Sequence, residues 1–444
     1  MEILAAAQAA RDVMRRSTAA DRAGWLTAAA DALDAAADEL VALAHEETHL
    51  PVARLTGELK RTTFQARLFA GADLAPVTVE PADPEWGMGP KPALVRTVVP
   101  IGPVLVFAAS NFPFAFSVFG GDTVSALAAG CPVVVKAHPG HPRLSRRTAE
   151  IVRGHLPFFG LIEGVEEGLT ALRDPRIKAV GFTGSTAGGR ALFDIAAARP
   201  EPIPFYGELG SVNPVVVTPA AWRERGTGIT REWIGSLTLG SGQFCTNPGI
   251  VLVPDAEGFL KGLQLPAPGR MLTDGLEQGY ADAVHRVGDL PGVRAAVQGP
   301  ANDEGVRASV LRSSARAVLA DPRMLEIEMF GPAGLVIGYA SPGELTEVLE
   351  LLPGQLTGTV QALSDGDDPV AAEVVELLAG KAGRIVYNDW PTGVTVSGAQ
   401  HHGGPYPATT APTSTSVGLH AIARWQRPVT FQGTPATVLP AHLR

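Results

Sequence analysis

The first 75 residues carry apolar side chains at helical spacing. Between positions 25 and 43 the apolar residues recur every three or four positions, as on one face of a helix. They are Trp25, Leu26, Ala29, Leu33, Ala36, Leu40 and Leu43. Thr18 or Asp21 is expected to cap this segment. The pattern predicts two or three helices over residues 3–75 that pack on a sheet, and no chemistry is expected from them.

From residue 101 onward, short apolar runs alternate with helical segments. The runs expected to be buried strands are 103–110, 131–137 and 177–185. The expected helices are 121–130, 141–156 and 186–198. This alternation predicts a parallel sheet with right-handed crossovers. Ligands of such sheets bind at the carboxyl ends of the strands, so the loops at Asn111, Lys136 and Gly184 are the places to look.

The second half of the chain repeats this alternation less regularly. Residues 207–253 contain a buried strand, a helix and a cysteine-bearing loop, and residues 328–341 contain another apolar run. Residues 385–410 are rich in glycine, proline and histidine. The last stretch predicts a short helix followed by β structure.

Length and charge narrow the class of protein. The chain has 444 residues, 45% apolar and 18% charged, which indicates a globular protein with more than one lobe. The net charge of −9 argues against a nucleic-acid partner. No apolar run is long enough for a membrane span, and the N-terminus does not resemble a signal peptide. With only two cysteines, the sequence favours a cytoplasmic protein without a disulfide framework.

The stretch GSGQFCTNPG (240–249) contains one of those cysteines, Cys245. Two interpretations remain open from the residues alone. Cys245 is either a small buried apolar residue or a nucleophile that a loop of small, turn-forming residues presents. Cys131 begins an apolar strand and is expected to be a core residue.

Several other residues have both a structural and a chemical interpretation. Glu208 follows a turn beside an apolar strand and is either a solvated turn residue or a shielded general base. Asn111 is either a turn residue or an oxyanion donor. Gly184, Ser185 and Gly189 surround a helix N-terminus, which can bind a phosphate. Their sequence matches neither the dinucleotide fingerprint nor a P-loop.

Lys136 and His138 follow a strand end, where they are either surface residues or ligands of a ribose or phosphate. The histidines could suggest a metal site. They are His138, His141, His401 and His402. They have no carboxylate partners at helical spacing, so no metal is expected.

The order of these motifs along the chain resembles the aldehyde dehydrogenase superfamily. The motifs are SNFPF (110–114), VVVKAHP (133–139), GFTGS (181–185), GELGSVNP (207–214), GQFCTNPG (242–249) and EMFGP (328–332). The resemblance runs from about residue 95 to the C-terminus. Within the superfamily the chain is most similar to NADP-dependent fatty-aldehyde and α-ketoglutaric (2,5-dioxovalerate) semialdehyde dehydrogenases.

The resemblance implies a fold and a set of roles. The fold would be α/β, with two Rossmann-like parallel-sheet lobes and a β flap for oligomerisation. Cys245 would attack the aldehyde, Asn111 and the Cys245 N–H would bind the oxyanion, and Glu208 would activate water. The residues expected to bind the cofactor are Lys136, His138, Gly184, Ser185, Gly189, Leu209, Glu328 and Phe330.

The nature of the cofactor stays open between NADP and NAD. His138 stands where NAD-preferring members often carry a glutamate, and Lys136, His138 and Arg143 suggest a positive surface, which favours NADP. Glu166 and Glu167, which stand in a region where NADP-using members often carry a basic residue, favour NAD instead.

The resemblance also suggests lobe boundaries, partners and a substrate pocket. A cofactor-binding lobe is expected at 1–206, with 85–100 contributing to oligomerisation, a catalytic lobe at 207–410 and an oligomerisation segment at 411–444. A homodimer or homotetramer acting on a small aldehyde is expected. The candidate pocket residues are Phe112, Phe114, Phe244, Trp390, His401 and His402. The first four would line an apolar tunnel, whereas the two histidines with Arg384 could meet a carboxylate. The alternatives are a CoA-acylating or acyl-reducing relative, or a catalytically impaired homologue.

Overall fold

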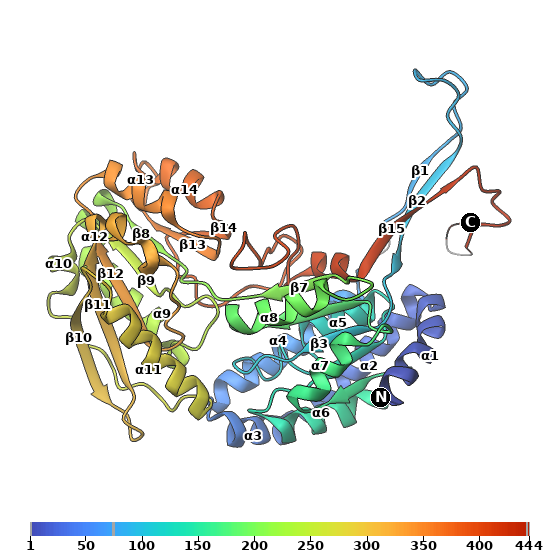
Figure 1. Cartoon of the computed structure of the whole chain (residues 1–444), viewed down its shortest axis with the longest axis horizontal. Helices are drawn as coiled ribbons and strands as arrows, with labels where there is room; N and C mark the ends of the chain where they lie inside the picture. Colours follow the sequence, from blue (N-terminus) through green and yellow to red (C-terminus); the bar gives the residue numbers. More distant parts are fainter. Residues whose placement is uncertain (1, 73–75, 441–442, 444) are drawn as a thin grey trace.

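The computed structural model describes residues 2–72, 76–440 and 443. Within this part of the chain the strands form one sheet of five, one of seven and one of three strands. The two larger sheets lie in two separate lobes, and the smallest sheet forms an arm that projects from the first lobe (Figure 1). This is the α/β architecture with two parallel-sheet lobes and a β flap that the sequence predicts.

The sheet of the first lobe is parallel throughout, in the order β5-β4-β3-β6-β7. Its strands are β3 (Val104–Phe107), β4 (Val133–Lys136), β5 (Gly160–Ile162), β6 (Ala179–Thr183) and β7 (Phe205–Glu208). The chain moves outward from β3 to β4 and β5, then returns to add β6 and β7 on the other side of β3. Such a switch point leaves a crevice at the carboxyl ends of the strands, where ligands bind.

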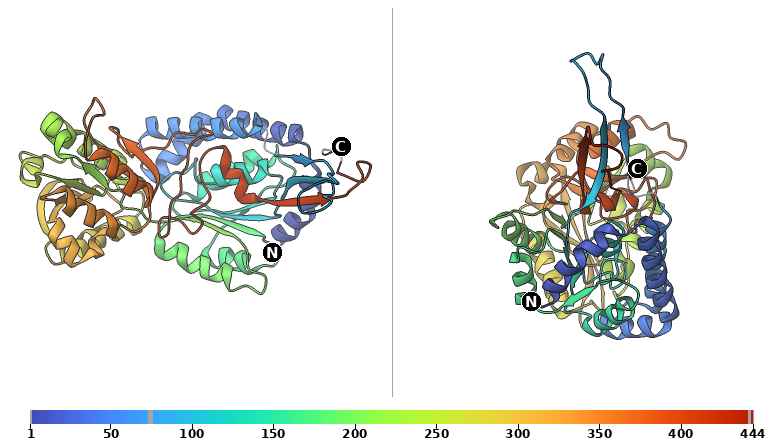
Figure 2. Two further views of the ribbon diagram at one scale, coloured as in Figure 1. Left: turned by 90° about the horizontal axis from the view of Figure 1, so that it is seen from above. Right: turned by 90° about the vertical axis from the view of Figure 1, so that its right-hand side faces the viewer.

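Helices cover both faces of this sheet (Figure 2). They are α1 (Glu2–Arg16), α2 (Ala19–Ala35), α3 (Ala37–Thr48), α4 (Val52–Ala70), α5 (Gly121–Ala128), α6 (Pro142–Arg153), α7 (Val165–Arg173) and α8 (Thr186–Ala197). Side chains alternate across each strand. Val104 and Val106 therefore pack against α2, α4, α5 and α6, whereas Leu105 packs against α1, α7 and α8.

The N-terminal region contains four helices where the sequence predicted two or three. Thr18 and Asp21 both act at the start of α2, because each side chain accepts from the other's backbone N–H in a capping box. The break between α2 and α3 falls at Ala36, within a run of strong helix formers. No residue there marks an end, so the sequence pattern could not reveal this break.

The second lobe has a mostly parallel sheet in the order β10-β11-β12-β9-β8-β13-β14, with β10 antiparallel at one edge. Its strands are β8 (Val215–Val217), β9 (Ile250–Val253), β10 (Arg294–Ala301), β11 (Arg307–Ser314), β12 (Ala333–Gly338), β13 (Gln355–Gln361) and β14 (Ala382–Tyr387). Its helices are α9 (Pro219–Thr238), η1 (Leu239–Gly242), α10 (Ala256–Leu260), α11 (Asp274–Gly288), α12 (Ala315–Ala320), η2 (Pro322–Leu325), α13 (Pro342–Leu351) and α14 (Ala371–Ala379). Helices α9 and α10 cover one face, and α11 to α14 cover the other.

The arm joins two distant parts of the sequence. Strand β2 (Leu94–Pro100) pairs antiparallel with both β1 (Thr78–Glu80) and β15 (Gln426–Gln432). Just before β15, η3 (Leu419–Trp425) packs on α5. The fully buried indole of Trp425 anchors this end, because its N–H donates to the Ser125 hydroxyl at 2.8 Å.

Two positions bear on the expected lobe boundaries. The boundary proposed between residues 206 and 207 falls inside β7. The segment that follows β14 returns to the first lobe, where Thr409 forms a bridge with Glu208. None of the helices that the structure describes has an apolar stretch sufficient to cross a bilayer.

Candidate active site

Cys245 lies in a tightly wound loop after α9. Gly240, Ser241 and Gly242 have φ values of 55°, 56° and 66°, so three successive residues adopt left-handed backbone. Glycine enters this region at no steric cost, whereas serine does not. The loop ends with the Cys245 side chain partly exposed, while Cys131 is fully buried beside the Trp425 carbonyl. The structure therefore presents Cys245 and places Cys131 in the core.

The glycines of this loop are needed for close packing. A Cβ added at Gly242 would lie 2.1 Å from the Gly331 carbonyl oxygen, and one at Gly240 would lie 2.6 Å from Arg54 Nη1. The sequence analysis did not anticipate these contacts. They tie the cysteine loop to the segment before β12 and to α4.

A buried amide network supports the loop from below. Asn213 has a φ of 45°, and its side-chain amide donates to the Cys245 carbonyl at 2.8 Å and to the Asn247 carbonyl at 3.0 Å. The Gln355 side-chain oxygen accepts from the Asn213 N–H at 3.1 Å and lies 2.9 Å from the Ser211 hydroxyl. Ser211 is therefore part of the support for the cysteine.

Three reactive side chains meet at this loop. His402 Nε2 lies 3.5 Å from Cys245 Sγ and 2.9 Å from Glu208 Oε1. The other carboxylate oxygen of Glu208 accepts from the Ser416 hydroxyl at 2.7 Å. The Thr415 hydroxyl accepts from the His402 N–H at 2.8 Å and fixes the histidine backbone. His402, which the sequence analysis placed only in the substrate pocket, is thus in contact with both expected catalytic residues.

The electrostatics of this cluster differ for its two acids. Burial opposes ionisation of Glu208, but the His402 imidazole and hydrogen bonds from His402, Ser416 and Cys245 outweigh it and hold the pKa of Glu208 below its usual value. Burial, together with the nearby Glu208 and Glu328 carboxylates, raises the pKa of the Cys245 thiol well above its usual value. At neutral pH the cluster therefore contains a carboxylate and a thiol that needs a base.

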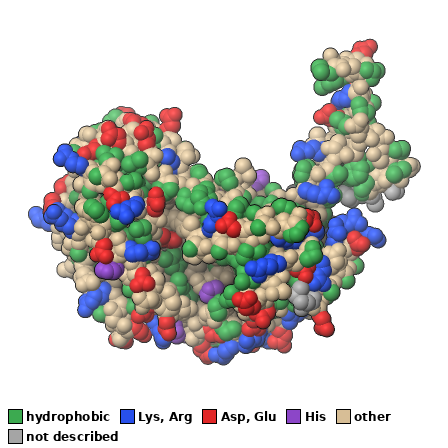
Figure 3. Space-filling model, viewed as in Figure 1, with side chains coloured by type: hydrophobic (Ala, Val, Ile, Leu, Met, Phe, Trp, Pro, Cys, Tyr) green, Lys and Arg blue, Asp and Glu red, His purple; other side chains and the backbone are tan. Residues whose placement is uncertain are grey.

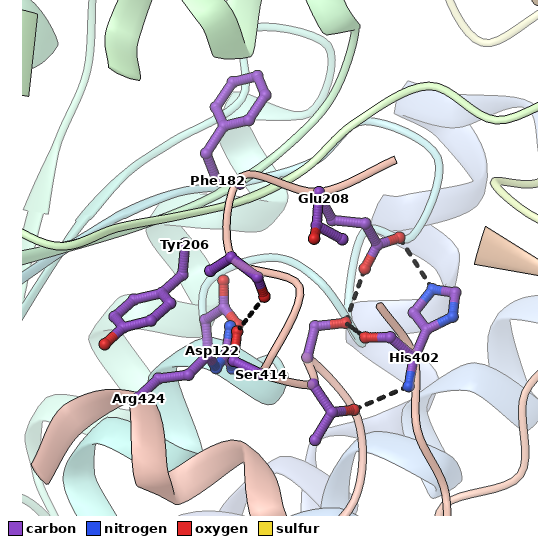
Figure 4. A pocket seen from close by; sticks show the side chains of 12 residues that line it. Asp122, Phe182, Tyr206, Glu208, His402, Ser414 and Arg424 are labelled. Carbon is purple, nitrogen blue, oxygen red and sulfur yellow. Dashed lines mark hydrogen bonds and ion pairs between the residues drawn. The ribbon is translucent and has the colours of Figure 1, made fainter. Parts of the chain in front are cut away.

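A small cavity lies behind Glu208, lined in part by Asp122, Tyr206, His402 and Arg424 (Figure 4). Its volume of about 20 Å³ is enough for one water molecule. Figure 4 shows the Glu208 carboxylate and the His402 imidazole side by side at this cavity, with Asp122 and Arg424 farther along it. Asp122 and Arg424 form a buried ion pair at 2.6 Å.

Asn111 is buried close to the cysteine loop. Its side-chain amide donates to the Gln243 carbonyl at 3.1 Å, two residues before Cys245. Its own carbonyl accepts from Arg54 Nη2 at 2.7 Å. The amide is therefore held against the cysteine loop, and an oxyanion formed at Cys245 would have to compete with the Gln243 carbonyl for it.

The expected cofactor residues of the first lobe lie at the carboxyl ends of its strands. Lys136 ends β4 and is half-buried, which lowers the pKa of its ammonium group. Burial, together with His141 and Lys136, lowers the pKa of His138 to about 3. His138 Nδ1 accepts from the Gly140 N–H at 3.0 Å, so the ring is neutral with its proton on Nε2.

This geometry corrects the positive surface that was expected here. His138 offers a hydrogen-bond donor and no charge at neutral pH. Arg143 forms an ion pair with Glu46 at 3.0 Å. Of the three residues, only the Lys136 ammonium remains as an uncommitted positive charge, since the described residues give it no ion pair.

The helix α8 begins at the same edge of the sheet. Ser185 caps it by accepting from the Gly188 N–H at 3.2 Å, and Gly184 immediately precedes it. A Cβ added at Gly189 would lie 2.2 Å from Leu209 Cδ2, so this glycine lets α8 pack against the loop after β7. The cap leaves the helix N-terminus free to face a bound anion.

Glu328 reaches this region from the second lobe. A Cβ added at Gly210 would lie 2.7 Å from Glu328 Oε2 and 2.9 Å from Thr186 Oγ1. Burial is the main cause that raises the pKa of Glu328 to about 8; Glu208 adds to it, and a backbone hydrogen bond from Ser211 opposes it. Phe330 follows two residues later and is partly exposed. The surface is hollowed where the two lobes meet (Figure 3).

The expected pocket residues divide into two groups. Phe112 and Phe244 stack edge to face, with centroids 5.6 Å apart, next to Asn111 and Cys245. Phe114 is buried in the core of the first lobe. Trp390 packs in the second lobe, and its indole N–H donates to Glu232 of α9 at 3.1 Å.

The expected carboxylate ligands lie elsewhere. His401 lines a separate surface pocket with His420 and Arg424. Arg384 donates to the carbonyls of Gly393 and Pro391 and to the Thr357 hydroxyl. Its guanidinium is therefore committed to the protein.

Sequence reasoning missed other residues of the site. Phe116 lies between Phe112, at 5.5 Å, and the His402 ring, at 6.4 Å. Arg54, Glu58 and Arg61 of α4 border this aromatic group. Their spacing of four and three residues places them on one helix face. This spacing was the one feature of the sequence that could have pointed to them.

The donor atoms of Glu208, Cys245 and His402 lie within 4.8 Å of one another. This set also suits a thiophilic cation such as Zn²⁺. That no metal is used therefore stays a prediction.

The fold and site define an α/β oxidoreductase of two lobes, with a crevice suited to a dinucleotide and a partly exposed thiol beside it. The model of the aldehyde dehydrogenase family matches residues 1–263. The chain belongs to this family, and it is an oxidoreductase that acts on aldehydes with NAD(P).

Two curated relatives align over nearly the whole chain. Alpha-ketoglutaric semialdehyde dehydrogenase 2 of Azospirillum brasilense is 45% identical over 99% of this chain and 87% of its own length. Alpha-ketoglutaric semialdehyde dehydrogenase of Acinetobacter baylyi is 39% identical over 100% of this chain and 88% of its own length.

Solved structures support the fold at lower identity. An apo betaine aldehyde dehydrogenase mutant from Staphylococcus aureus superposes with a TM-score of 0.80 at 19% identity, covering 98% of this chain and 88% of the other. A glyceraldehyde-3-phosphate dehydrogenase from Methanocaldococcus jannaschii, complexed with NADP, gives 0.79 at 18% identity, covering 97% and 93%.

Proposed function

We propose that the chain oxidises the aldehyde group of a small semialdehyde to a carboxylate, with Cys245 as the nucleophile and NADP as the hydride acceptor. One observation carries the proposal. A single nitrogen, His402 Nε2, contacts both the Cys245 thiol and the Glu208 carboxylate.

In the first step the thiol loses its proton as it attacks. Because the pKa of Cys245 is raised, a base must take this proton at the moment of attack. The Glu208 carboxylate, which forms a hydrogen bond with the Cys245 thiol and is held ionised by His402 and Ser416, takes this proton and passes it to solvent. The sulfur bonds to the aldehyde carbon, and the carbonyl oxygen becomes an oxyanion.

Two N–H donors stabilise that oxyanion. They are the Asn111 amide, released from the Gln243 carbonyl, and the backbone N–H of Cys245. Bound NADP supplies an acceptor for the hydride of the substrate carbon. Glu208 then takes a proton from water, whose oxygen bonds to the acyl carbon, and the acid leaves as the sulfur regains a proton.

The residues of the first lobe suit a dinucleotide with a 2′-phosphate. Lys136 supplies a positive charge, and the Nε2–H of His138 supplies a neutral donor. A glutamate at position 138 would repel that phosphate. Ser185 with the start of α8 would hold the pyrophosphate, and Leu209, Glu328 and Phe330 would contribute to binding of the ribose and nicotinamide.

The substrate follows from the relatives. Both are named for alpha-ketoglutaric semialdehyde, so we propose this compound or a close semialdehyde, rather than a fatty aldehyde. A CoA-acylating activity fits less well, because Glu208 is in place to activate water. An impaired homologue fits less well too, because Cys245 and Glu208 both contact His402 and the Asn111 amide donates to the cysteine loop at Gln243.

We also infer a homodimer or homotetramer, assembled through the projecting arm, whose exposed apolar residues include Val79, Trp86 and Met88. The first lobe would bind the cofactor and the second would carry the nucleophile. The two free cysteines agree with a cytoplasmic location.

A panel of semialdehydes and alkanals, each assayed with NAD and with NADP, tests the proposal. The wild type is expected to reduce NADP with α-ketoglutaric semialdehyde, and Cys245→Ala is expected to bind NADP without turnover. Turnover by Cys245→Ala would contradict the covalent mechanism. His138→Glu is expected to shift preference toward NAD, and an unchanged ratio would remove His138 from cofactor selection.

A further inference from the structure

Two arginines of α4 face the aromatic group beside Cys245 without an ion-pair partner. The Arg54 guanidinium lies 4.4 Å from the centre of the Phe244 ring and 5.2 Å from that of Phe112. Arg61 lies 5.6 Å from the centre of the Phe116 ring. These three rings border the cysteine loop and His402, so both cations stand next to the reaction site.

Both guanidinium groups keep unused donors. Arg54 Nη2 donates to the Asn111 carbonyl, but its Nε and Nη1 are buried and have no hydrogen-bond partner among the described residues. Arg61 Nη1 is likewise buried and has no hydrogen-bond partner among the described residues. A buried cation with unpaired N–H groups is costly, and an anion is the natural partner.

Glu58, whose carboxylate lies between the two arginines in the sequence of α4, forms no ion pair with either of them. Glu58 lies on the same face of α4, yet its Oε1 accepts from the backbone N–H groups of Phe114 and Ala115 at 2.8 and 2.9 Å. Among the described residues no carboxylate oxygen comes within 4.0 Å of a nitrogen of Arg54 or Arg61, although several other arginines have such ion pairs. The other oxygen of Glu58, Oε2, is buried without a hydrogen-bond partner, and burial raises the pKa of this carboxyl, so Glu58 does not neutralise both guanidinium groups.

The other cations considered for a substrate are already used. Arg384 is held by three protein acceptors, and His401 lines another pocket. Arginine also suits carboxylates better than other cations do, because its planar fork makes two parallel hydrogen bonds.

We propose that Arg61 and Arg54 form the subsite for the distal carboxylate of the substrate, so that the enzyme selects aldehydes carrying a carboxylate a few carbons from the aldehyde carbon. Arg54 would bind the anion and hold the Asn111 backbone, whereas Arg61 would act on the anion alone. The inference rests on the proposed oxidation at Cys245 and adds to it how the substrate is chosen.

Arg61→Met provides the cleaner test, because Arg61 touches none of the proposed reacting groups. We expect kcat/KM for glutarate semialdehyde to fall about 10–100-fold, mainly through KM, as for loss of a charged hydrogen bond. The kcat/KM for pentanal, of equal length without the charge, should stay unchanged or rise. Arg61→Lys should recover part of the loss, since it keeps the charge.

Arg67→Met is the matched control. Arg67 lies on the same helix but pairs with Asp31 and Asp34 at the surface, so neither substrate should be affected. Equal losses on both aldehydes in Arg61→Met would show a structural role and overturn the proposal, as would the absence of any loss.

A binding measurement separates failure of this subsite from failure of the proposed oxidation. Glutarate, which lacks an aldehyde, should raise the unfolding temperature of wild type and Arg67→Met but not of Arg61→Met. No shift in wild type would overturn the subsite even if aldehydes are oxidised. A shift that depends on Arg61 would support it even if the proposed turnover fails.

Discussion

At the residue scale, the surroundings of Cys245 and Glu208 shift the pKa values of the two acids in opposite directions, and His402 contacts both. The Cys245 thiol is hard to ionise, whereas Glu208 is held as a carboxylate by His402 and Ser416. The motifs led to Cys245, Glu208 and Asn111 as candidate catalytic residues, and their roles stay predictions. The sequence could not assign His402, because the contact depends on a loop that returns almost two hundred residues after Glu208.

The contribution of His402 to deprotonation of the thiol can be tested by thiol reactivity. His402→Gln should slow alkylation of Cys245 by iodoacetamide about 10–100-fold at neutral pH, because Glu208, the proton acceptor of the thiol, loses the imidazole that helps to hold it as a carboxylate. Peptide mapping after timed quenching measures the rate, with Cys131 expected to stay unmodified. His401→Gln is the control, and equal rates in wild type and His402→Gln would exclude the role.

Glu328 should impose a pH dependence on stability. Its pKa is about 8 in the folded protein and near 4.5 when unfolded, so the folded state binds one more proton between these values. Stability must therefore fall as pH rises through this window.

Glu328→Gln removes that loss. Without cofactor, its unfolding temperature should exceed that of the wild type by about 1–3 °C at pH 8 and match it near pH 4.5, as scanning fluorimetry would show. A difference of equal size at both pH values would contradict the raised pKa.

At the element scale, the sequence predicted the strand-helix alternation better than the contribution of the N-terminal helices. Burial of whole strands such as β3 and β4 is visible in their apolar runs. Helix α4 was expected to be inert, yet it supplies Arg54 and Glu58 to the loops of the site. From the sequence alone, charged residues on a helix are expected to face solvent, and only the tertiary packing shows that those of α4 face the site.

The cysteine loop should be sensitive to substitution of its glycines. Gly242→Ala is expected to cost at least about 1–2 kcal/mol, because its φ of 66° is strained for alanine and the Gly331 carbonyl blocks the added carbon. Chemical denaturation and activity should both report the loss. Gly279→Ala in α11 has open space and ordinary backbone, so it should be neutral or stabilising; equal behaviour of the two variants would contradict the packing argument.

At the scale of the whole molecule, the two lobes carry the groups proposed for the cofactor and the proposed nucleophile, and the surface between them is hollowed (Figure 3). The sequence predicts two lobes and an arm, but the crossing of the chain back to the first lobe depends on long-range pairing. Strand β15 pairs with β2 more than three hundred residues away, and no local pattern indicates that partner.

The arm predicts a concentration-dependent assembly. Replacing Trp86 and Met88 by serine should increase the monomer fraction in light scattering, because both side chains expose apolar surface on the projecting hairpin. Val13→Ser, which removes an exposed apolar residue from α1, should leave the assembly unchanged. A double variant that assembles like the wild type would show that the arm tip is not the interface.

The central claim is that Cys245 carries the acyl group and Glu208 releases it. The direct measurement is the intact mass of Glu208→Gln, quenched after mixing with α-ketoglutaric semialdehyde and NADP. We predict a burst of about one NADPH per site and an added acyl mass mapped to Cys245, because the variant slows hydrolysis of the thioester more than it slows hydride transfer. Continued turnover with no adduct on Cys245, or an adduct on another residue, would contradict the account.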